Sequence, residues 1–187
     1  MVQKIRAKPR LTPADWVYAG IDLLVEGGIA AVRIDRLASS LGVTRGSFYH
    51  HFKDREALLH EMLDYWVQKW TYSIFEEITL LDLGPATTLI TLIKMVRGRN
   101  AAQYEATFRA WALHDPMAKE VVRRADEERL SFIRKLFQAL GFKGLDAENR
   151  ARLFLYYEMS EPAMFAEQTP EMEAALIGER HRLLTVR

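Results

Sequence analysis

Polar, basic and aromatic residues gather between positions 44 and 55, and their types suit contacts to nucleic acid. Arg45 can offer two donors to a guanine edge, Ser47 is short enough to bring the backbone close to base edges, and Gly46 leaves room where DNA would approach. Longer side chains nearby can donate to phosphate oxygens, which position a protein without specifying sequence. The candidate DNA contacts in this stretch are Thr44, Arg45, Gly46, Ser47, Tyr49, His50, Lys53 and Arg55.

Two short helices around Gly42 are expected to position these residues. Gly42 can take the left-handed backbone of a tight turn, and Thr44 can cap the second helix. The apolar residues at steps of three and four predict inward faces formed by Ile34, Leu37, Ala38 and Leu41 on the first helix and by Phe48 and Phe52 on the second. The outward residues then suit a helix that enters the major groove. A compact three-helix packing without a DNA partner is the alternative.

Charge is distributed unevenly along the chain. Residues 1–53 contain eight Lys and Arg against four Asp and Glu, a net charge of +4, and the remaining residues contain 18 against 21, a net charge of −3. A basic segment followed by an acidic one is typical of a polyanion-binding module joined to another module. Chance clustering of solvated charge would give the same pattern, so charge alone leaves both interpretations open.

The stretch from Leu11 to Leu63 resembles the DNA-binding domain of TetR-family regulators. The resemblance rests on Gly28 to Ala31, on the helix-turn-helix between Ile34 and Phe52, and on the tail Phe52-Lys53-Asp54-Arg55-Glu56-Ala57-Leu58-Leu59. It implies that Tyr49 and Arg55 contact phosphates. It also implies a homodimer, a pocket for a small-molecule effector, and usually repression of transcription from double-stranded operator DNA.

The entrance of the helix-turn-helix departs from the family pattern. The family usually has Ser or Thr at the start of its second helix, where this chain has Arg33 after Val32. Losing a capping oxygen costs about 1 kcal/mol, whereas an arginine at this point can reach a phosphate. Arg33 is therefore a further candidate for DNA contact.

The chain as a whole is predicted to be all-α, with about nine helices. Helix starts are predicted at Thr12-Pro13, Asp115-Pro116 and Thr169-Pro170, and also at Asp54, Gly84-Pro85 and Asp146. Helices are short before Asp54, and no breaker follows it until Gly84. We expect a DNA-binding domain over residues 9–69, with the helix-turn-helix at about 33–52, and a helical domain for effector binding and dimerisation over residues 70–187.

The second domain is rich in aromatic residues, of which most are expected to fill the core and some to line an apolar effector pocket. The candidate pocket residues are Trp66, Trp70, Tyr104, Phe108, Trp111 and His114. The resemblance places a dimer interface on the last two helices, over 147–165 and 171–184, with Leu153, Tyr156, Tyr157 and Met164 as contacts and a kink at Pro162. A domain that binds a protein partner, and a role as an activator, stay open.

Several other classes are disfavoured. The chain contains no cysteine, which excludes disulfides and thiolate zinc sites. His60-Glu61-x-x-Asp64 lacks the second histidine of a zinc protease helix, and the adjacent His50 and His51 point about 100° apart on a helix. We expect no metal, no cofactor and no enzymatic activity. With no signal peptide and no apolar segment of membrane length, a cytoplasmic protein is expected.

Overall fold

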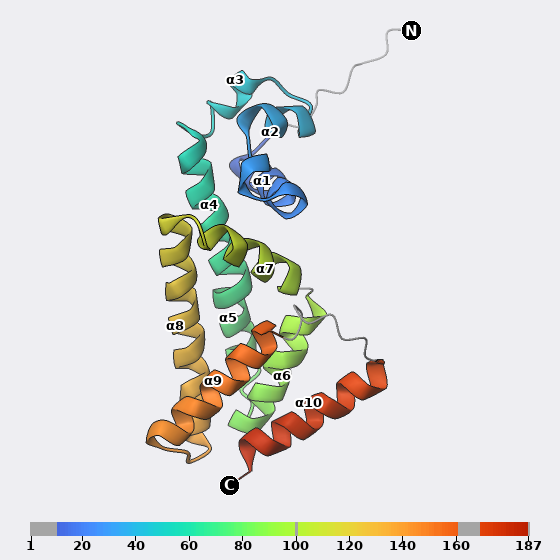
Figure 1. Cartoon of the computed structure of the whole chain (residues 1–187), viewed down its shortest axis with the longest axis vertical. Helices are drawn as coiled ribbons and strands as arrows, with labels where there is room; N and C mark the ends of the chain where they lie inside the picture. Colours follow the sequence, from blue (N-terminus) through green and yellow to red (C-terminus); the bar gives the residue numbers. More distant parts are fainter. Residues whose placement is uncertain (1–10, 100, 161–168, 187) are drawn as a thin grey trace. The chain divides into compact units, whose positions relative to one another are not determined.

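The computed structural model describes residues 11–99, 101–160 and 169–186, and all regular structure in these ranges is helical. It contains the α-helices α1 to α10, and a π-helical segment joins α4 and α5 into one continuous helix, so that nine separate helices result within the described ranges (Figure 1). The prediction of an all-α chain of about nine helices is confirmed. No helix in the described ranges is long and apolar enough to cross a bilayer.

The chain divides into two compact units, Met1–Tyr65 and Trp66–Arg187. The first unit contains α1 (Pro13–Gly27), a 3₁₀ turn (Ile29–Ala31), α2 (Ile34–Ser40), α3 (Arg45–Phe48) and most of α4 (Arg55–Val67). The second contains the end of α4, the π-helical segment Gln68–Tyr72, α5 (Ser73–Leu80), α6 (Pro85–Gly98), α7 (Ala101–Ala112), α8 (Pro116–Ala139), α9 (Gly144–Ser160) and α10 (Pro170–Thr185). The boundary between the units falls inside α4.

Local capping chemistry explains most helix starts. Helices begin directly after Thr12, Asp54, Gly84, Asp115 and Thr169, as predicted. The side chains of Thr12, Asp115 and Thr169 each accept a hydrogen bond from a backbone N–H in the first turn that follows. The start predicted directly after Asp146 is wrong by three residues, because α9 already begins at Gly144. Asp146 lies in the first turn instead, where its carboxylate pairs with Arg150 at 2.8 Å.

The uninterrupted helix predicted between Asp54 and Gly84 contains a π-helical turn. The apolar residues Trp66, Trp70, Ile74 and Ile78 are four residues apart, and each step of four overshoots a full α-helical turn by about 40°. In a regular α-helix, three such steps would turn the last side chain about 120° away from the first around the helix axis. The extra residue of a π-turn reduces this offset by about 100°. The π-helical segment therefore keeps Trp66, Ile74 and Ile78 on the buried side of the helix.

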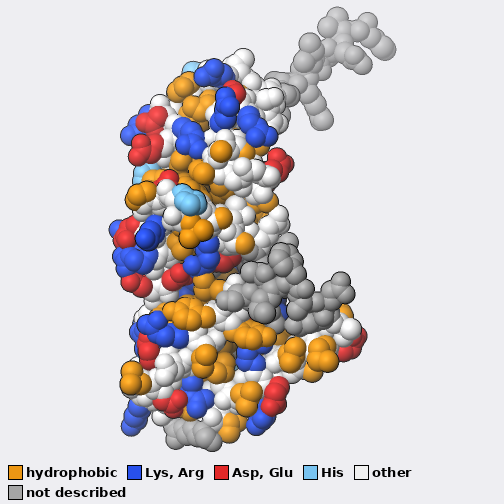
Figure 2. All heavy atoms as spheres, viewed as in Figure 1, with side chains coloured by type: hydrophobic (Ala, Val, Ile, Leu, Met, Phe, Trp, Pro, Cys, Tyr) orange, Lys and Arg blue, Asp and Glu red, His pale blue; other side chains and the backbone are white. Residues whose placement is uncertain are grey.

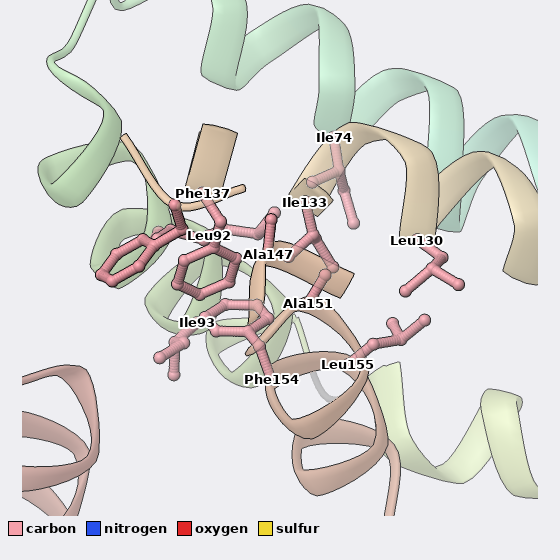
Figure 3. Packing of buried hydrophobic residues seen from close by; sticks show 12 residues of the cluster. Ile74, Leu92, Ile93, Leu130, Ile133, Phe137, Ala147, Ala151, Phe154 and Leu155 are labelled. Atoms are coloured by element: carbon pink, nitrogen blue, oxygen red, sulfur yellow. The ribbon is translucent and has the colours of Figure 1, made fainter. Parts of the chain in front are cut away.

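Each unit has its own hydrophobic core. In the first, Trp16 of α1 meets Phe48 of α3 edge to face, with 5.3 Å between the ring centroids, and both side chains are fully buried. In the second, α8 contacts α6, α7 and α9. Figure 3 shows the core that α5, α6, α8 and α9 build there; it includes Ile74, Leu92, Ile133, Phe137 and Phe154. These two cores position the candidate functional residues.

Candidate nucleic-acid interface

Backbone hydrogen bonds hold the turn between α2 and α3. Gly42 has a φ of 65°, the left-handed conformation expected of it. The N–H of Val43 donates to the carbonyl oxygen of Ala38 at 2.9 Å, which closes the turn. The predicted inward face is confirmed for Leu37, Ala38, Phe48 and Phe52, which are all buried, whereas Ile34 and Leu41 are half-buried.

The helix α3 is shorter than the predicted recognition helix. It covers only Arg45–Phe48, and turns follow as far as His51. The side chain of Thr44 makes no capping hydrogen bond, contrary to expectation. The N–H of Phe52 nevertheless donates to the carbonyl oxygen of Phe48 at 3.0 Å, and the two rings stack with centroids 5.4 Å apart. The helical sense therefore continues to Phe52, with both rings on the buried side.

Most of the predicted DNA contacts are exposed to solvent. The exposed ones are Arg33, Thr44, Arg45, Gly46, Tyr49, His50 and Lys53, and the half-buried ones are Ser47 and Arg55. Figure 2 shows Lys and Arg side chains over the surface that α2 and α3 form. Among the residues described, no carboxylate pairs with Arg45, so its guanidinium is available to a ligand. In the same ranges, no group of three or more His, Asp or Glu side chains is placed to hold a metal ion.

Arg55 has a structural role that the sequence did not indicate. Its Nε donates to the carbonyl oxygen of Val32 at 2.6 Å, and its Nη2 donates to that of Ile29 at 2.9 Å. These carbonyls belong to the segment that leads into α2. The partners lie 23 and 26 residues away in the chain, so no local pattern could have indicated the contact. A phosphate contact by Arg55 stays a prediction, and it must use the remaining donors of the guanidinium.

Arg33 occupies the N-cap position of α2 and makes no capping hydrogen bond with its side chain. Its guanidinium instead pairs with the carboxylate of Asp35, with Nε 3.2 Å from Oδ1. Both side chains are about half exposed or more, at 65% for Arg33 and 48% for Asp35. The uncapped entrance inferred from the sequence is therefore present, and Arg33 can exchange its exposed ion pair for another anion.

The predicted effector-pocket residues fall into an aromatic cluster, with one exception. Trp66 stacks on Phe108 with centroids 5.2 Å apart, and Trp70 stacks on Tyr104 at 5.3 Å. Trp111 lies beside Phe108, at 6.0 Å. Trp66, Phe108 and Trp111 are buried and the other pair is half-buried. The exception is His114, which is exposed in the turn after α7.

A buried arginine that sequence reasoning missed faces this cluster. Arg129 of α8 is only 8% exposed and its guanidinium carbon lies 5.0 Å from the centre of the Trp66 ring. Its Nε donates to the hydroxyl oxygen of Thr71 at 2.9 Å, and its Nη2 to the carbonyl oxygen of Trp70 at 3.3 Å. Its Nη1 donates to Glu105 of α7 at 2.9 Å. One side chain thus ties α8 to the π-helical segment and to α7.

A second arginine completes the polar network. Arg109 donates to both carboxylate oxygens of Asp126, at 2.9 and 2.5 Å, and to Glu105 at 2.8 Å. Burial lowers the pKa of the Arg109 guanidinium, but the hydrogen bond to Asp126 and the charge of Glu105 outweigh that effect, so its pKa is raised. Glu105 accepts from Arg109 and from Arg129 alike. Two arginines and two carboxylates therefore balance each other in this network.

The residues predicted for a dimer interface lie on an exposed part of α9, where they are described. Leu153, Tyr156 and Tyr157 are 61%, 51% and 38% exposed. Met164 and Pro162 lie outside the described residues. The neighbouring α10 contains no buried residue in its 16 positions, and it exposes Met172, Leu176 and Leu183. Figure 2 shows patches of hydrophobic side chains in the region where α9 and α10 lie.

Sequence comparisons identify relatives of the first unit. Residues 17–62 match the model of the bacterial regulatory proteins of the tetR family. YerO of Bacillus subtilis, an uncharacterized HTH-type transcriptional regulator, is 39% identical over 51 residues, which are 27% of this chain and 18% of YerO. The HTH-type transcriptional repressor KstR2 of Mycobacterium tuberculosis is 25% identical over 111 residues, which are 59% of this chain and 52% of KstR2. The match therefore spans about half of the length of KstR2 and less than a fifth of YerO.

A solved structure extends the likeness in fold to most of the chain. AibR, solved in complex with isovaleryl coenzyme A and operator DNA, superposes with a TM-score of 0.67 over 92% of this chain and 97% of AibR, at 14% sequence identity. At this identity the likeness concerns the fold. The sequence match falls on the segment that contains α2, the turn at Gly42 and α3. Residues 17–62 thus match the tetR family of bacterial regulatory proteins in sequence, and most of the chain is similar to AibR in fold.

Proposed function

We propose that this protein is a DNA-binding transcriptional regulator that binds a pseudo-palindromic operator as a homodimer and represses transcription until a small-molecule effector binds. The observation that carries the proposal is the exposed guanidinium of Arg45 at the start of α3, with which no described carboxylate pairs. It lies on a helix-turn-helix whose interior is packed around Trp16 and Phe48. KstR2 is named as a repressor and AibR was solved with operator DNA, which supports the same function here.

The candidate contact residues of α3 and of the segment that follows it divide into two roles. Arg45 and Ser47 read base edges, because the first residues of a recognition helix reach furthest into the major groove. Tyr49, His50 and Lys53 donate to phosphates, which sets the position of the helix along the groove. Two copies related by a two-fold axis place their α3 helices in successive major grooves, about 34 Å apart.

The exposed face of α9 and α10 supports the homodimer. A helix that shows several apolar residues to solvent is stabilised when a partner covers them. A second copy of the chain covers Leu153 and Tyr156 on α9 and the Met172, Leu176 and Leu183 stripe on α10. Leu153→Glu is expected to shift the protein from dimer to monomer in analytical ultracentrifugation and to weaken operator binding with it. Arg124→Glu, an exposed position on α8, is the control.

The aromatic cluster of α7 supports the effector. Buried rings beside a few fixed polar groups are what small-molecule sites commonly offer. An effector that binds one spacing of the two recognition helices better than another shifts the equilibrium toward that spacing and changes operator affinity. A protein partner in place of the small molecule predicts a stable heteromeric complex and no stabilisation by small apolar compounds in a thermal-shift screen.

A gel shift tests DNA binding directly. The wild-type protein and an Arg45→Ala, Tyr49→Ala double variant are titrated against DNA fragments taken from beside the gene. We expect the wild type to retard at least one fragment and the double variant to lose that retardation at the same concentration. Arg123→Ala removes one positive charge from an exposed position on α8 and should leave the shift unchanged. Equal binding by the wild type and the double variant would show that the assigned surface is wrong.

A further inference from the structure

Two buried indole N–H groups in the second unit have no hydrogen-bond acceptor. The Nε1 atoms of Trp66 and Trp111 are shielded from solvent and unpaired within the described part of the chain. Both rings lie beside Phe108, with centroids at 5.2 and 6.0 Å from it. Buried polar groups are almost always paired, and an unpaired donor costs free energy. Two such donors around one ring point to an acceptor that a ligand supplies.

The setting of these donors differs from that of the unpaired indole in the first unit. Trp16 also has a buried Nε1 without a partner, but its ring lies among Phe48 and His51. No second unpaired buried donor is found in the described residues of that unit. Trp16 therefore serves as an internal reference for an indole that a ligand does not reach.

A second aromatic pair offers a way to the first. Trp70 follows Trp66 by four residues, and Tyr104 precedes Phe108 by four. The rings of Trp70 and Tyr104 stack on each other, as those of Trp66 and Phe108 do. This outer pair is half-buried, whereas Trp66 and Phe108 are fully buried. A half-buried side chain gives up fewer contacts than a buried one when it changes rotamer. A flat molecule can therefore reach Phe108 by taking the place of the Trp70–Tyr104 contact.

Charge decides which ligands the cluster accepts. Arg129 and Arg109 face Glu105 and Asp126, and their hydrogen bonds pair every charge with an opposite one. A charged ligand would bring an unpaired charge into a buried site, which is costly. The two groups of the cluster that have no partner, the indole N–H groups of Trp66 and Trp111, are both donors. The complementary ligand is neutral and carries an acceptor.

We propose that the effector is a flat, neutral molecule with a carbonyl oxygen, which lies against Phe108 and accepts a hydrogen bond from the indole N–H of Trp66, of Trp111 or of both. This inference rests on the proposed ligand-responsive function and adds the chemical class of the effector. The carbonyl removes the cost of the unpaired donors, and the flat apolar body lies against the aromatic rings.

Matched probes test the chemical class. Equilibrium dialysis of the full chain compares the ketone 2-acetylnaphthalene with 2-isopropylnaphthalene, which lacks the acceptor, and with 2-naphthoate, which adds a charge. A second set uses acetophenone, isopropylbenzene and benzoate. We expect at least one ketone to bind about tenfold more tightly than both of its counterparts, a difference of about 1.4 kcal/mol.

Variants and spectra identify the donor. Trp66→Phe or Trp111→Phe should reduce the preference for the ketone to less than about threefold, while the matched control Trp16→Phe, in the first unit, keeps it. Because Trp66→Phe alters a fully buried side chain, the indole ¹H–¹⁵N spectrum of the wild type gives a second measurement. The ketone should shift the indole N–H signal of Trp66 or Trp111 downfield, the hydrocarbon should not, and the signal of Trp16 should stay in place.

Two outcomes would overturn the inference. One is that no ketone binds more tightly than its hydrocarbon or carboxylate counterpart, which would mean that buried water or the rings themselves satisfy the two indoles. The other is a downfield shift confined to Trp16 or Trp70. Dialysis without DNA keeps this result separate from the proposed function. A protein that retards operator DNA but binds no ketone remains a regulator with a different effector.

Discussion

The side chain of Arg55 is bonded to the backbone of Val32 through a hydrogen bond of 2.6 Å from its Nε to the carbonyl oxygen. A second bond, from Nη2 to Ile29, holds the same segment. This segment leads directly into α2, whose first residue lacks a side-chain cap. Arg55 therefore compensates at long range for the weak entrance of the helix-turn-helix, whatever contact it also makes with DNA.

Two variants test the role of Arg55: one removes both its charge and its planar guanidinium, and the other removes only the guanidinium. Arg55→Met should lower the stability of the protein by about 1.5–3 kcal/mol, because two hydrogen bonds from a charged group are lost. Arg55→Lys keeps the charge but cannot bond both carbonyls at once, so it should lose a similar amount. Urea unfolding followed by circular dichroism measures both variants, with the exposed Lys53→Met as control. An unchanged midpoint for Arg55→Met would refute the structural role.

Arg33→Ser should have opposite effects on stability and on DNA binding. Serine at the N-cap of α2 supplies the missing oxygen and should stabilise the helix by about 0.5–1 kcal/mol, whereas the exposed pair with Asp35 contributes little. If Arg33 contacts a phosphate, the same variant binds operator DNA more weakly and with a shallower salt dependence. Thermal unfolding and a salt titration of binding measure the two effects. Weaker binding together with lower stability would contradict the proposed role.

Two glycine variants test why each position lacks a side chain. At Gly20 the missing Cβ leaves room for the folded core, and at Gly46 it leaves room for DNA. In Gly20→Ala, the new Cβ would lie 2.7 Å from the sulfur of the fully buried Met62, so a loss of about 1–3 kcal/mol is expected. In Gly46→Ala, the Cβ would meet only the Thr44 hydroxyl at 3.7 Å, an ordinary contact. Gly46→Ala should therefore fold at least as stably as the wild type and bind operator DNA more weakly. Full DNA affinity in Gly46→Ala would remove this residue from the interface.

Arg129 is expected to hold the π-helical segment in place. Arg129→Met leaves Glu105 with one arginine fewer and leaves the Thr71 hydroxyl and the Trp70 carbonyl without their donor, so a loss of about 3–5 kcal/mol is expected. Amide hydrogen exchange should rise over residues 68–72. Arg124→Met, on an exposed face of the same helix, should change stability by less than about 0.5 kcal/mol. Equal effects of the two variants would refute the prediction.

The cap of α1 should respond to acid. Backbone and side-chain hydrogen bonds from Thr12 hold the pKa of Asp15 below its ordinary value of 3.8. A carboxyl whose pKa is lowered by folding stabilises the folded state above its unfolded pKa, and this contribution disappears as the pH falls through the folded value. The melting temperature of the wild type should therefore fall more between pH 5 and pH 3 than that of Asp15→Asn. Parallel curves for the two proteins would contradict this assignment.

The elements that could be predicted from the sequence are those that local interactions determine. The caps at Thr12, Asp115 and Thr169 satisfy N–H groups two or three residues away, and the turn at Gly42 needs only the glycine itself. Helical periodicity likewise depends on steps of three and four residues. For the same reason, the surface of α3 could be predicted from the spacing of Phe48 and Phe52.

Contacts between distant segments were decided by tertiary packing alone. Arg55 meets carbonyls 23 and 26 residues away, and Arg129 meets Thr71 and Trp70 at 58 and 59 residues. Local sequence patterns could not indicate these contacts, because the partners lie far away in the chain. The π-helical turn also depends on tertiary packing. It forms because burying apolar residues on both sides of it outweighs the local preference for a regular α-helix.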